Sequence, residues 1–223
     1  MGLDMRPMGK PKPGYEGLYL RLFAILQGKE KQSRGFLDQL GSAKPLTQDE
    51  LLQHWYAIQI PTYETIGAPQ VGRDAAADTW IRELYTQAGQ QMTEEEFVKE
   101  YEGYYVIELA AEEDGVPVYK AMEQDENVFR GEFLTDCIDL VGEELVQEAW
   151  ETKLAPEALD YGQRLMAVAS TIAKEHGLEY LKTQRLPPDV DEESLESKLH
   201  ILFSAARWLI FYGRNGHGYE ADY

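Results

Sequence analysis

Ile201-Leu-Phe-Ser-Ala-Ala-Arg-Trp-Leu-Ile-Phe-Tyr212 is the stretch that decides the fold of this chain. All of its residues are apolar except Ser204 and Arg207, so an α-helix built from them is apolar on every side. Such a helix is stable only when other elements surround it, because none of its faces suits water. The stretch therefore predicts a central, buried helix towards the C-terminal end. It is too short to cross a bilayer, which takes about 20 apolar residues.

The segment before this stretch predicts a long amphipathic helix. Pro156 suits the first turn of a helix, and Gly177 suits its end. Between them, apolar or small residues recur at the spacing of one helical face: Leu159, Gly162, Leu165, Met166, Ala169, Ile172 and Ala173. The small residues of this set would let a second helix approach closely. After Pro187-Pro188, we expect the last helix to take Asp189 or Asp191 as its N-cap.

Helix starts are also clear in the N-terminal half of the chain. Thr47-Gln-Asp-Glu50 and Thr93-Glu-Glu-Glu96 are capping boxes, in which the Thr hydroxyl and the Glu carboxylate each accept a hydrogen bond from the other residue's backbone. Periodic apolar residues from Tyr15 to Gly28 predict a further helix. We therefore predict a mostly α fold, a multi-helix bundle around the central apolar C-terminal helix.

Residues 104–119 have strand character. Tyr104-Tyr-Val-Ile favours a strand, Asp114-Gly115 favours a turn, and apolar residues return after it. We expect a short β-hairpin near 104–119. The alternative is that the helix starting at Thr93 continues to Ala111.

The length of 223 residues suits a single globular domain over 1–223. An acidic, turn-rich stretch makes a subdivision near 112–127 a second option. Prolines and glycines from Pro7 to Gly14 leave little room for a helix or a strand. We therefore expect 1–14 to be an irregular basic leader.

Charge divides the chain unevenly. The sequence holds 21 Lys and Arg against 40 Asp and Glu, a formal net charge of −19. The first 34 residues carry seven bases and three acids, so the remaining 189 residues have a net charge of −23. This acidic part of the chain repels the phosphates of nucleic acids and of anionic membranes, and it favours a basic partner. We expect no direct binding to a nucleic-acid backbone and no membrane association.

The sequence contains no recognised catalytic, cofactor or metal motif. The four histidines form no i, i+4 pair and Cys137 is the single cysteine, so the usual metal-ligand spacings are missing. Ala68-Pro-Gln-Val-Gly72 resembles a stretch of peptide deformylases, but the cysteine and His-Glu-x-x-His motifs of that family are absent. We therefore predict no cofactor and no metal, and leave open whether the protein is an enzyme. The single cysteine and the absence of a signal segment favour a cytoplasmic protein.

Cationic residues at unusual positions are the candidates for a site in so acidic a chain. Arg207 lies within the apolar stretch, where a guanidinium must be paired or must line a cavity. Its partner would be an acid, Asp136 or Asp160, or a bound anion. Residues just after the last helix combine a guanidinium and an imidazole with glycines. The candidate ligand-binding residues are Arg6, Arg130, Arg207, Arg214 and His217.

Two functions from different classes are consistent with these features. The first is an interaction or regulatory role, in which the acidic surface meets a basic protein. The alternative is a binder of, or an enzyme acting on, a small anionic ligand held in a pocket lined by Arg and His.

Overall fold

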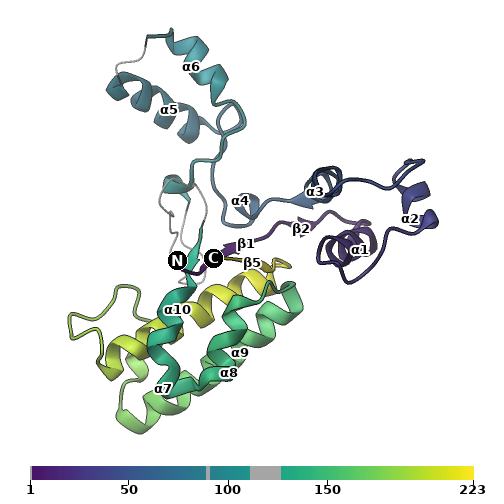
Figure 1. Ribbon diagram of the computed structural model, residues 1–223. Helices are drawn as coiled ribbons and strands as arrows, with labels where there is room; N and C mark the ends of the chain where they lie inside the picture. Colours follow the sequence, from purple (N-terminus) through teal and green to yellow (C-terminus); the bar gives the residue numbers. More distant parts are fainter. Residues whose placement is uncertain (1, 89–90, 111–126) are drawn as a thin grey trace. The chain divides into compact units, whose positions relative to one another are not determined.

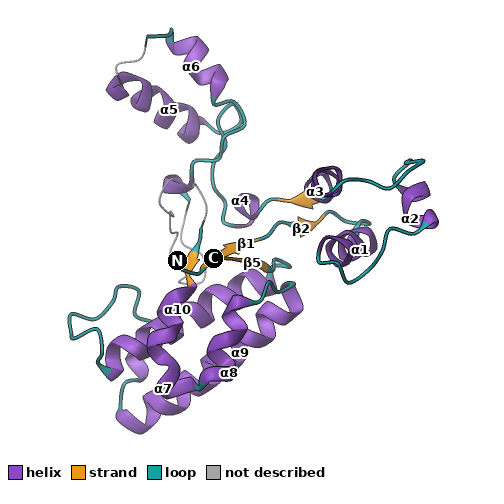
Figure 2. Cartoon of the chain, viewed as in Figure 1, coloured by secondary structure: helices purple, strands orange, loops and turns teal. Residues whose placement is uncertain are grey.

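The computed structural model describes residues 2–88, 91–110 and 127–223, and shows a mostly helical protein with a small antiparallel sheet (Figure 1, Figure 2). This confirms the predicted fold class. The chain forms two compact units: unit 1 comprises Met1–Met8 and Thr62–Tyr223, and unit 2 comprises Gly9–Pro61. The division falls at residues 8–9 and 61–62. The single domain predicted over 1–223 stays a prediction, as does its subdivision near 112–127, which lies outside the described residues except for Asn127.

Unit 1 holds the longest helices and one three-stranded sheet. Its strands are β1 (Asp4–Pro7), β4 (Phe129–Arg130) and β5 (Tyr219–Asp222). Its helices are α4 (Thr62–Thr65), α5 (Ala75–Ala88), α6 (Glu94–Glu100), α7 (Ile138–Val141), α8 (Glu143–Gln147), α9 (Ala155–His176) and α10 (Leu195–Arg214). Its 3-10 turns are Ile107–Leu109, Gly131–Cys137, Glu148–Trp150 and Glu179–Lys182.

Unit 2 is a smaller helical unit. It consists of β2 (Lys10–Pro11), α1 (Glu16–Leu26), α2 (Arg34–Gln39), α3 (Gln48–Ala57) and β3 (Gln59–Ile60). α1 packs on α3, where the rings of Tyr19 and Trp55 stack with centroids 5.3 Å apart. β2 pairs with β3 in an antiparallel ladder.

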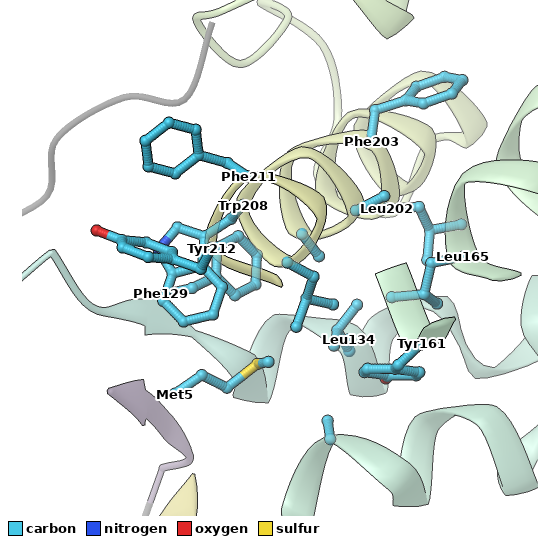
Figure 3. Packing of buried hydrophobic residues seen from close by; sticks show 14 of the residues in the cluster. Met5, Phe129, Leu134, Tyr161, Leu165, Leu202, Phe203, Trp208, Phe211 and Tyr212 are labelled. Atoms are coloured by element: carbon cyan, nitrogen blue, oxygen red, sulfur yellow. The ribbon is translucent and has the colours of Figure 1, made fainter. Parts of the chain in front are cut away.

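The core of unit 1 is built around α10, as the sequence predicts. The α10 residues between Leu202 and Ala206 are buried without a break, and Trp208 and Leu209 continue the buried run. α10 lies beside α9, and Figure 3 shows the two helices contributing Leu165, Tyr161 and Trp208 to one apolar cluster.

Glycines allow the close approach of these two helices. A Cβ added to Gly162 of α9 would lie 2.7 Å from Leu209 Cβ, and one added to Gly213 of α10 would lie 2.7 Å from Leu159 Cβ. Carbon atoms in normal contact are about 3.5 to 4.0 Å apart, so only glycine fits at this separation. The small-residue face predicted for the 156–177 helix is therefore a true contact face.

The N-cap residues in the structure confirm two predicted helix starts and correct a third. Thr47 and Thr93 each form a complete capping box at the start of α3 and α6. α10 instead begins after Ser194, whose hydroxyl accepts a hydrogen bond from the Ser197 backbone N–H at 3.2 Å. The predicted N-cap at Asp189 or Asp191 is therefore wrong, because a nearer residue satisfies the first turn.

Residues 1–14 are not irregular throughout, which corrects the sequence prediction. β1 lies between β4 and β5 in the antiparallel sheet, with Met5 opposite both Phe129 and Ala221. The Met5 side chain is fully buried. Pro7 and Pro11 are the last residues of β1 and β2, so neither interrupts its strand. Much of the pairing of β1 is with residues from the far end of the chain, which local composition does not reveal.

The predicted hairpin near 104–119 is described only up to residue 110. Within that part, Tyr105 forms an isolated antiparallel bridge with Gln70 and is followed by a 3-10 turn. The alternative of one helix from Thr93 to Ala111 is wrong, because α6 ends at Glu100 and Gly103 adopts a φ of +88°. Residues 111–119 lie outside the described residues.

None of the helices in the described part of the chain combines the length and the apolar character that a membrane-spanning segment needs.

Candidate binding groove

A groove of ≈ 540 Å³ opens in unit 1 beside the first half of α10. Two stretches of chain line it, residues 128–136 and 185–204. Its apolar lining residues are Val128, Phe129, Phe133, Leu186, Pro187 and Ile201. Its polar lining residues are Arg130, Asp136, Arg185, Glu192, Ser197, His200 and Ser204.

The first wall of the groove is shaped by a 3-10 turn, Gly131–Cys137. This helix repeats every three residues, so side chains at i and i+3 share a face. Leu134 and Cys137 are fully buried on one face. Phe133 and Asp136 share another face and line the groove, and Phe133 is 48% exposed.

Hydrogen bonds to α10 hold the start of this wall. Trp208 Nε1 donates to the Asn127 carbonyl at 3.1 Å, and Asn127 Nδ2 donates to the Tyr212 hydroxyl at 2.9 Å. These bonds fix the backbone just before Val128 and Phe129. The groove residues on this side therefore sit on the rigid core of unit 1.

The opposite wall is the segment that leads into α10, and Arg207 ties it to that helix. Arg207 Nη1 donates to the Lys182 carbonyl at 3.2 Å, and Nη2 donates to the Gln184 carbonyl at 2.9 Å. Nη2 also lies 3.3 Å from the hydroxyl of Ser204, which lines the groove. The guanidinium thus binds backbone carbonyls.

One acid expected from sequence as a partner of Arg207 has another partner. Asp160 accepts a hydrogen bond from Arg164 Nε at 2.8 Å within α9. The prediction of an Arg207–Asp160 ion pair is therefore not supported by these contacts, and Arg207 is best described as a positioning residue for the groove wall.

The chain around the groove is acidic. Residues 128–139 and 185–204 together hold three Lys and Arg against eight Asp and Glu, a net charge of −5. Arg130 pairs with Asp4 at 3.1 Å, and Lys198 pairs with Asp139 at 2.9 Å. Asp136 and Glu192 line the groove itself and are exposed to solvent.

His200 is the most buried polar side chain of the groove after Ser204, with only 8% of its surface exposed. Burial lowers the pKa of His200, and hydrogen bonding with the backbone of Arg185 opposes this by raising it. The Arg207 charge lowers the pKa further. Among the described residues, the buried Nε2 atom has no hydrogen-bond partner.

The five residues predicted from sequence do not gather at one site. Arg130 lines the groove and Arg207 supports its wall. Arg6 pairs with Asp222 across the sheet at 2.5 Å, and Arg214 is exposed at the last position of α10. His217 is fully buried, and its ring nitrogens contact the Met8 carbonyl at 2.8 Å and the Thr65 hydroxyl at 2.6 Å. The separation of Arg207 and Arg214 is about 10 Å along α10.

Arg130 is the one groove-lining residue among the five candidates; the other lining residues, Phe133, Leu186 and His200 among them, were not predicted as site residues. Phe133 gives no helical signal because a 3-10 turn has period three. Leu186 had a signal, since it directly precedes Pro187-Pro188 in a polar segment. Among the described residues, no group of three or more His, Cys, Asp or Glu is arranged to hold a metal ion.

Comparison with known proteins finds no match among protein-family models, curated proteins or solved structures. The groove and its surrounding charges are therefore the basis for a functional proposal.

Proposed function

We propose that this protein is an interaction module, and that the groove beside α10 binds a basic segment of a partner protein through apolar side chains of that segment. The observation that supports this most directly is an apolar groove whose surrounding chain is strongly acidic. The groove supplies the attraction for apolar groups, and the acids select a partner with Lys and Arg around them. A cytoplasmic location belongs to the same proposal and rests on the single cysteine.

Exposed apolar side chains provide the contact energy. Phe133 is 48% exposed and Leu186 is 77% exposed, and both line the groove. Burying a side chain of this size fully stabilises a complex by about 1.5 to 3 kcal/mol. Two such side chains together contribute about 3 to 6 kcal/mol, to which contacts with the groove floor and with the surrounding charges add.

The negative charge around the groove determines which partner segments it prefers. The net charge of −5 on residues 128–139 and 185–204 attracts a basic segment and raises its association rate, and this attraction weakens as salt increases. The same charge opposes the alternative ligand, a small anion. Arg130 and Arg185 favour an anion, but Arg130 is already paired with Asp4, and Asp136 and Glu192 share the groove with them.

Phage display of random peptides tests the proposal, because the selection assumes nothing about the sequence of the partner segment. The full chain is the bait, and selected peptides are measured by isothermal titration against groove and control variants. The groove variant is Phe133→Ser with Leu186→Ser. The control is Ile138→Ser with Val190→Ser, residues that are 45% and 47% exposed but do not line the groove.

We expect enriched peptides with a net positive charge and at least two large apolar residues. Their affinity should fall by about tenfold or more in the groove variant and stay unchanged in the control. Enrichment of acidic or uncharged peptides, equal binding by the groove variant, or no enrichment at all would each overturn the proposal. Acidic peptides lost in the groove variant would support the anionic-ligand alternative instead.

A further inference from the structure

We infer that the groove beside α10 binds the outer face of α1 from a second copy of this chain, so that unit 2 of one copy docks on unit 1 of another. The outer face of α1 comprises Gly17, Leu20 and Ala24, which share one side of the helix by their spacing. This inference rests on the proposed function, since it names the basic segment that the groove binds.

α1 is apolar on the side that faces away from its buried residues. Only Glu16 and Arg21 of its eleven residues are charged. Its buried side chains are Tyr19, Leu22, Phe23 and Ile25. Leu20 lies on the opposite side of the helix and is 52% exposed. A helix that is apolar on every side suits a position where other elements surround it, so this outer face is a candidate contact surface.

The charge around α1 is opposite to the charge around the groove. Residues 9–34 hold six Lys and Arg against two Asp and Glu, a net charge of +4, whereas residues 128–139 and 185–204 have a net charge of −5. Lys29 and Lys31 follow the end of α1 and are exposed. Asp136 and Glu192 line the groove and are exposed as well. The two surfaces are therefore complementary in charge.

Leu20 supplies the apolar side chain that the groove requires. An amphipathic helix binds a hydrophobic groove through apolar residues at helical spacing. Phe133 and Leu186 line the groove and are themselves exposed, so contact with Leu20 removes apolar surface of both copies from water. Gly17 and Ala24 have no long side chains that would hold the helix away from the groove.

A contact between two identical surfaces fits these charges less well. Two grooves facing each other would bring two acidic surfaces together. The net charge of −19 on each copy opposes association at long range, but the Debye length is about 8 Å at physiological salt, so the charges at the contact dominate there. The contact therefore joins different surfaces, and it either closes a reciprocal pair or continues from copy to copy.

Analytical ultracentrifugation of the full chain at physiological salt, from micromolar to millimolar concentration, tests this inference. One variant is Leu20→Ser, which changes the outer face of α1. A second is the groove variant, Phe133→Ser with Leu186→Ser. The control is Tyr56→Ser, at a residue of α3 that is 59% exposed and belongs to neither surface.

We expect the average mass of the wild type to rise with concentration. Leu20→Ser and the groove variant should each raise the dissociation constant about ten- to a hundredfold, the range expected for burying one large apolar side chain, and the control should leave it unchanged. A mixture of Leu20→Ser with the groove variant should associate again and stop at two copies. The first variant keeps an intact groove, and the second keeps an intact α1.

Three results would each overturn the inference: a wild type that stays monomeric throughout, self-association that is unchanged in Leu20→Ser, or a mixture that stays monomeric. Thermal melting shows whether each variant is folded. Lys29→Glu with Lys31→Glu changes only exposed residues and should weaken association about three- to tenfold. Unchanged association of this variant would contradict the charge complementarity and also overturn the inference.

Failure of this inference is distinguishable from failure of the proposed function. If basic peptides are selected and depend on Phe133 and Leu186 while the wild type stays monomeric, the groove binds a different protein and only the contact between copies is wrong. If the copies associate through Leu20 and the groove while no basic peptide is selected, the contact between copies stands and the general preference for basic segments is wrong.

Discussion

Replacing Gly213 with alanine is the sharpest test of how α9 and α10 form the core. The added Cβ would lie 2.7 Å from Leu159 Cβ and 2.8 Å from the Leu159 Cα and N atoms. Two of these are backbone atoms, so no side-chain rotation relieves the clash, and the helices must separate by roughly 1 Å to restore normal contact. Overpacking of this kind costs about 1 to 3 kcal/mol, and the backbone contact places Gly213→Ala at the upper end.

A smaller, opposite effect must be deducted. Alanine is favoured over glycine within a helix by about 1 kcal/mol. The net loss of unfolding free energy is therefore about 2 kcal/mol, which lowers the melting temperature by about 4 to 8 °C for a protein of this size. Urea unfolding followed by far-UV circular dichroism measures the difference.

Gly17→Ala is the matched control. Gly17 lies in α1, and a Cβ added there meets nothing within 4 Å. This variant should be as stable as the wild type or up to about 1 kcal/mol more stable. If Gly213→Ala is no less stable than the wild type, then the close contact between α9 and α10 is not what stabilises the core.

Three further predictions concern an ion pair, a thiol and a strand. The hydrogen bond from Arg164 holds the pKa of Glu148 below its ordinary value. The pair therefore stabilises the fold at any pH above that ordinary pKa, and the stabilisation is lost as the pH falls through the lower pKa of the folded state. Arg164→Met should reduce the difference in unfolding free energy between neutral and acidic pH. Burial raises the pKa of Cys137 to about 12. The thiol should therefore resist Ellman's reagent at neutral pH in the folded protein and react fully in urea. Fast labelling of the folded protein would contradict the burial of this thiol. Met5→Ala should cost about 2 to 5 kcal/mol if β1 is part of the core, whereas an irregular leader would tolerate the change.

Elements with strong local signals were predicted well from the sequence. The apolar run of α10, the small-residue face of α9 and the capping boxes at Thr47 and Thr93 each depend on residues within one or two helical turns. Periodicity and capping act over that range, so the sequence contains the whole signal.

Features that depend on distant residues were not predictable in the same way. β1 forms because its partners come from residues 129–130 and 219–222, and Pro7 and Gly9 gave a stronger local signal for irregular structure. The groove likewise depends on a period-three turn and on a segment that Arg207 holds by backbone carbonyls. An acidic partner was expected for Arg207 because charge is visible in a sequence, whereas the direction of a backbone carbonyl is not.

The pairing of β1 with β5 has a consequence for the synthesis of the protein. Asp4 pairs with Asp222, so the ribosome makes 218 further residues before the partner of the first strand exists. At about 5 to 20 residues per second, this takes about 10 to 40 s, during which Met5 has no complete sheet to enter. Gly9–Pro61 is contiguous in the chain and has all its own contacts available much earlier. Nascent chains stalled before residue 219 should therefore contain a folded unit 2 and an incomplete unit 1, and would expose β1 to chaperones until residues 219–222 are made.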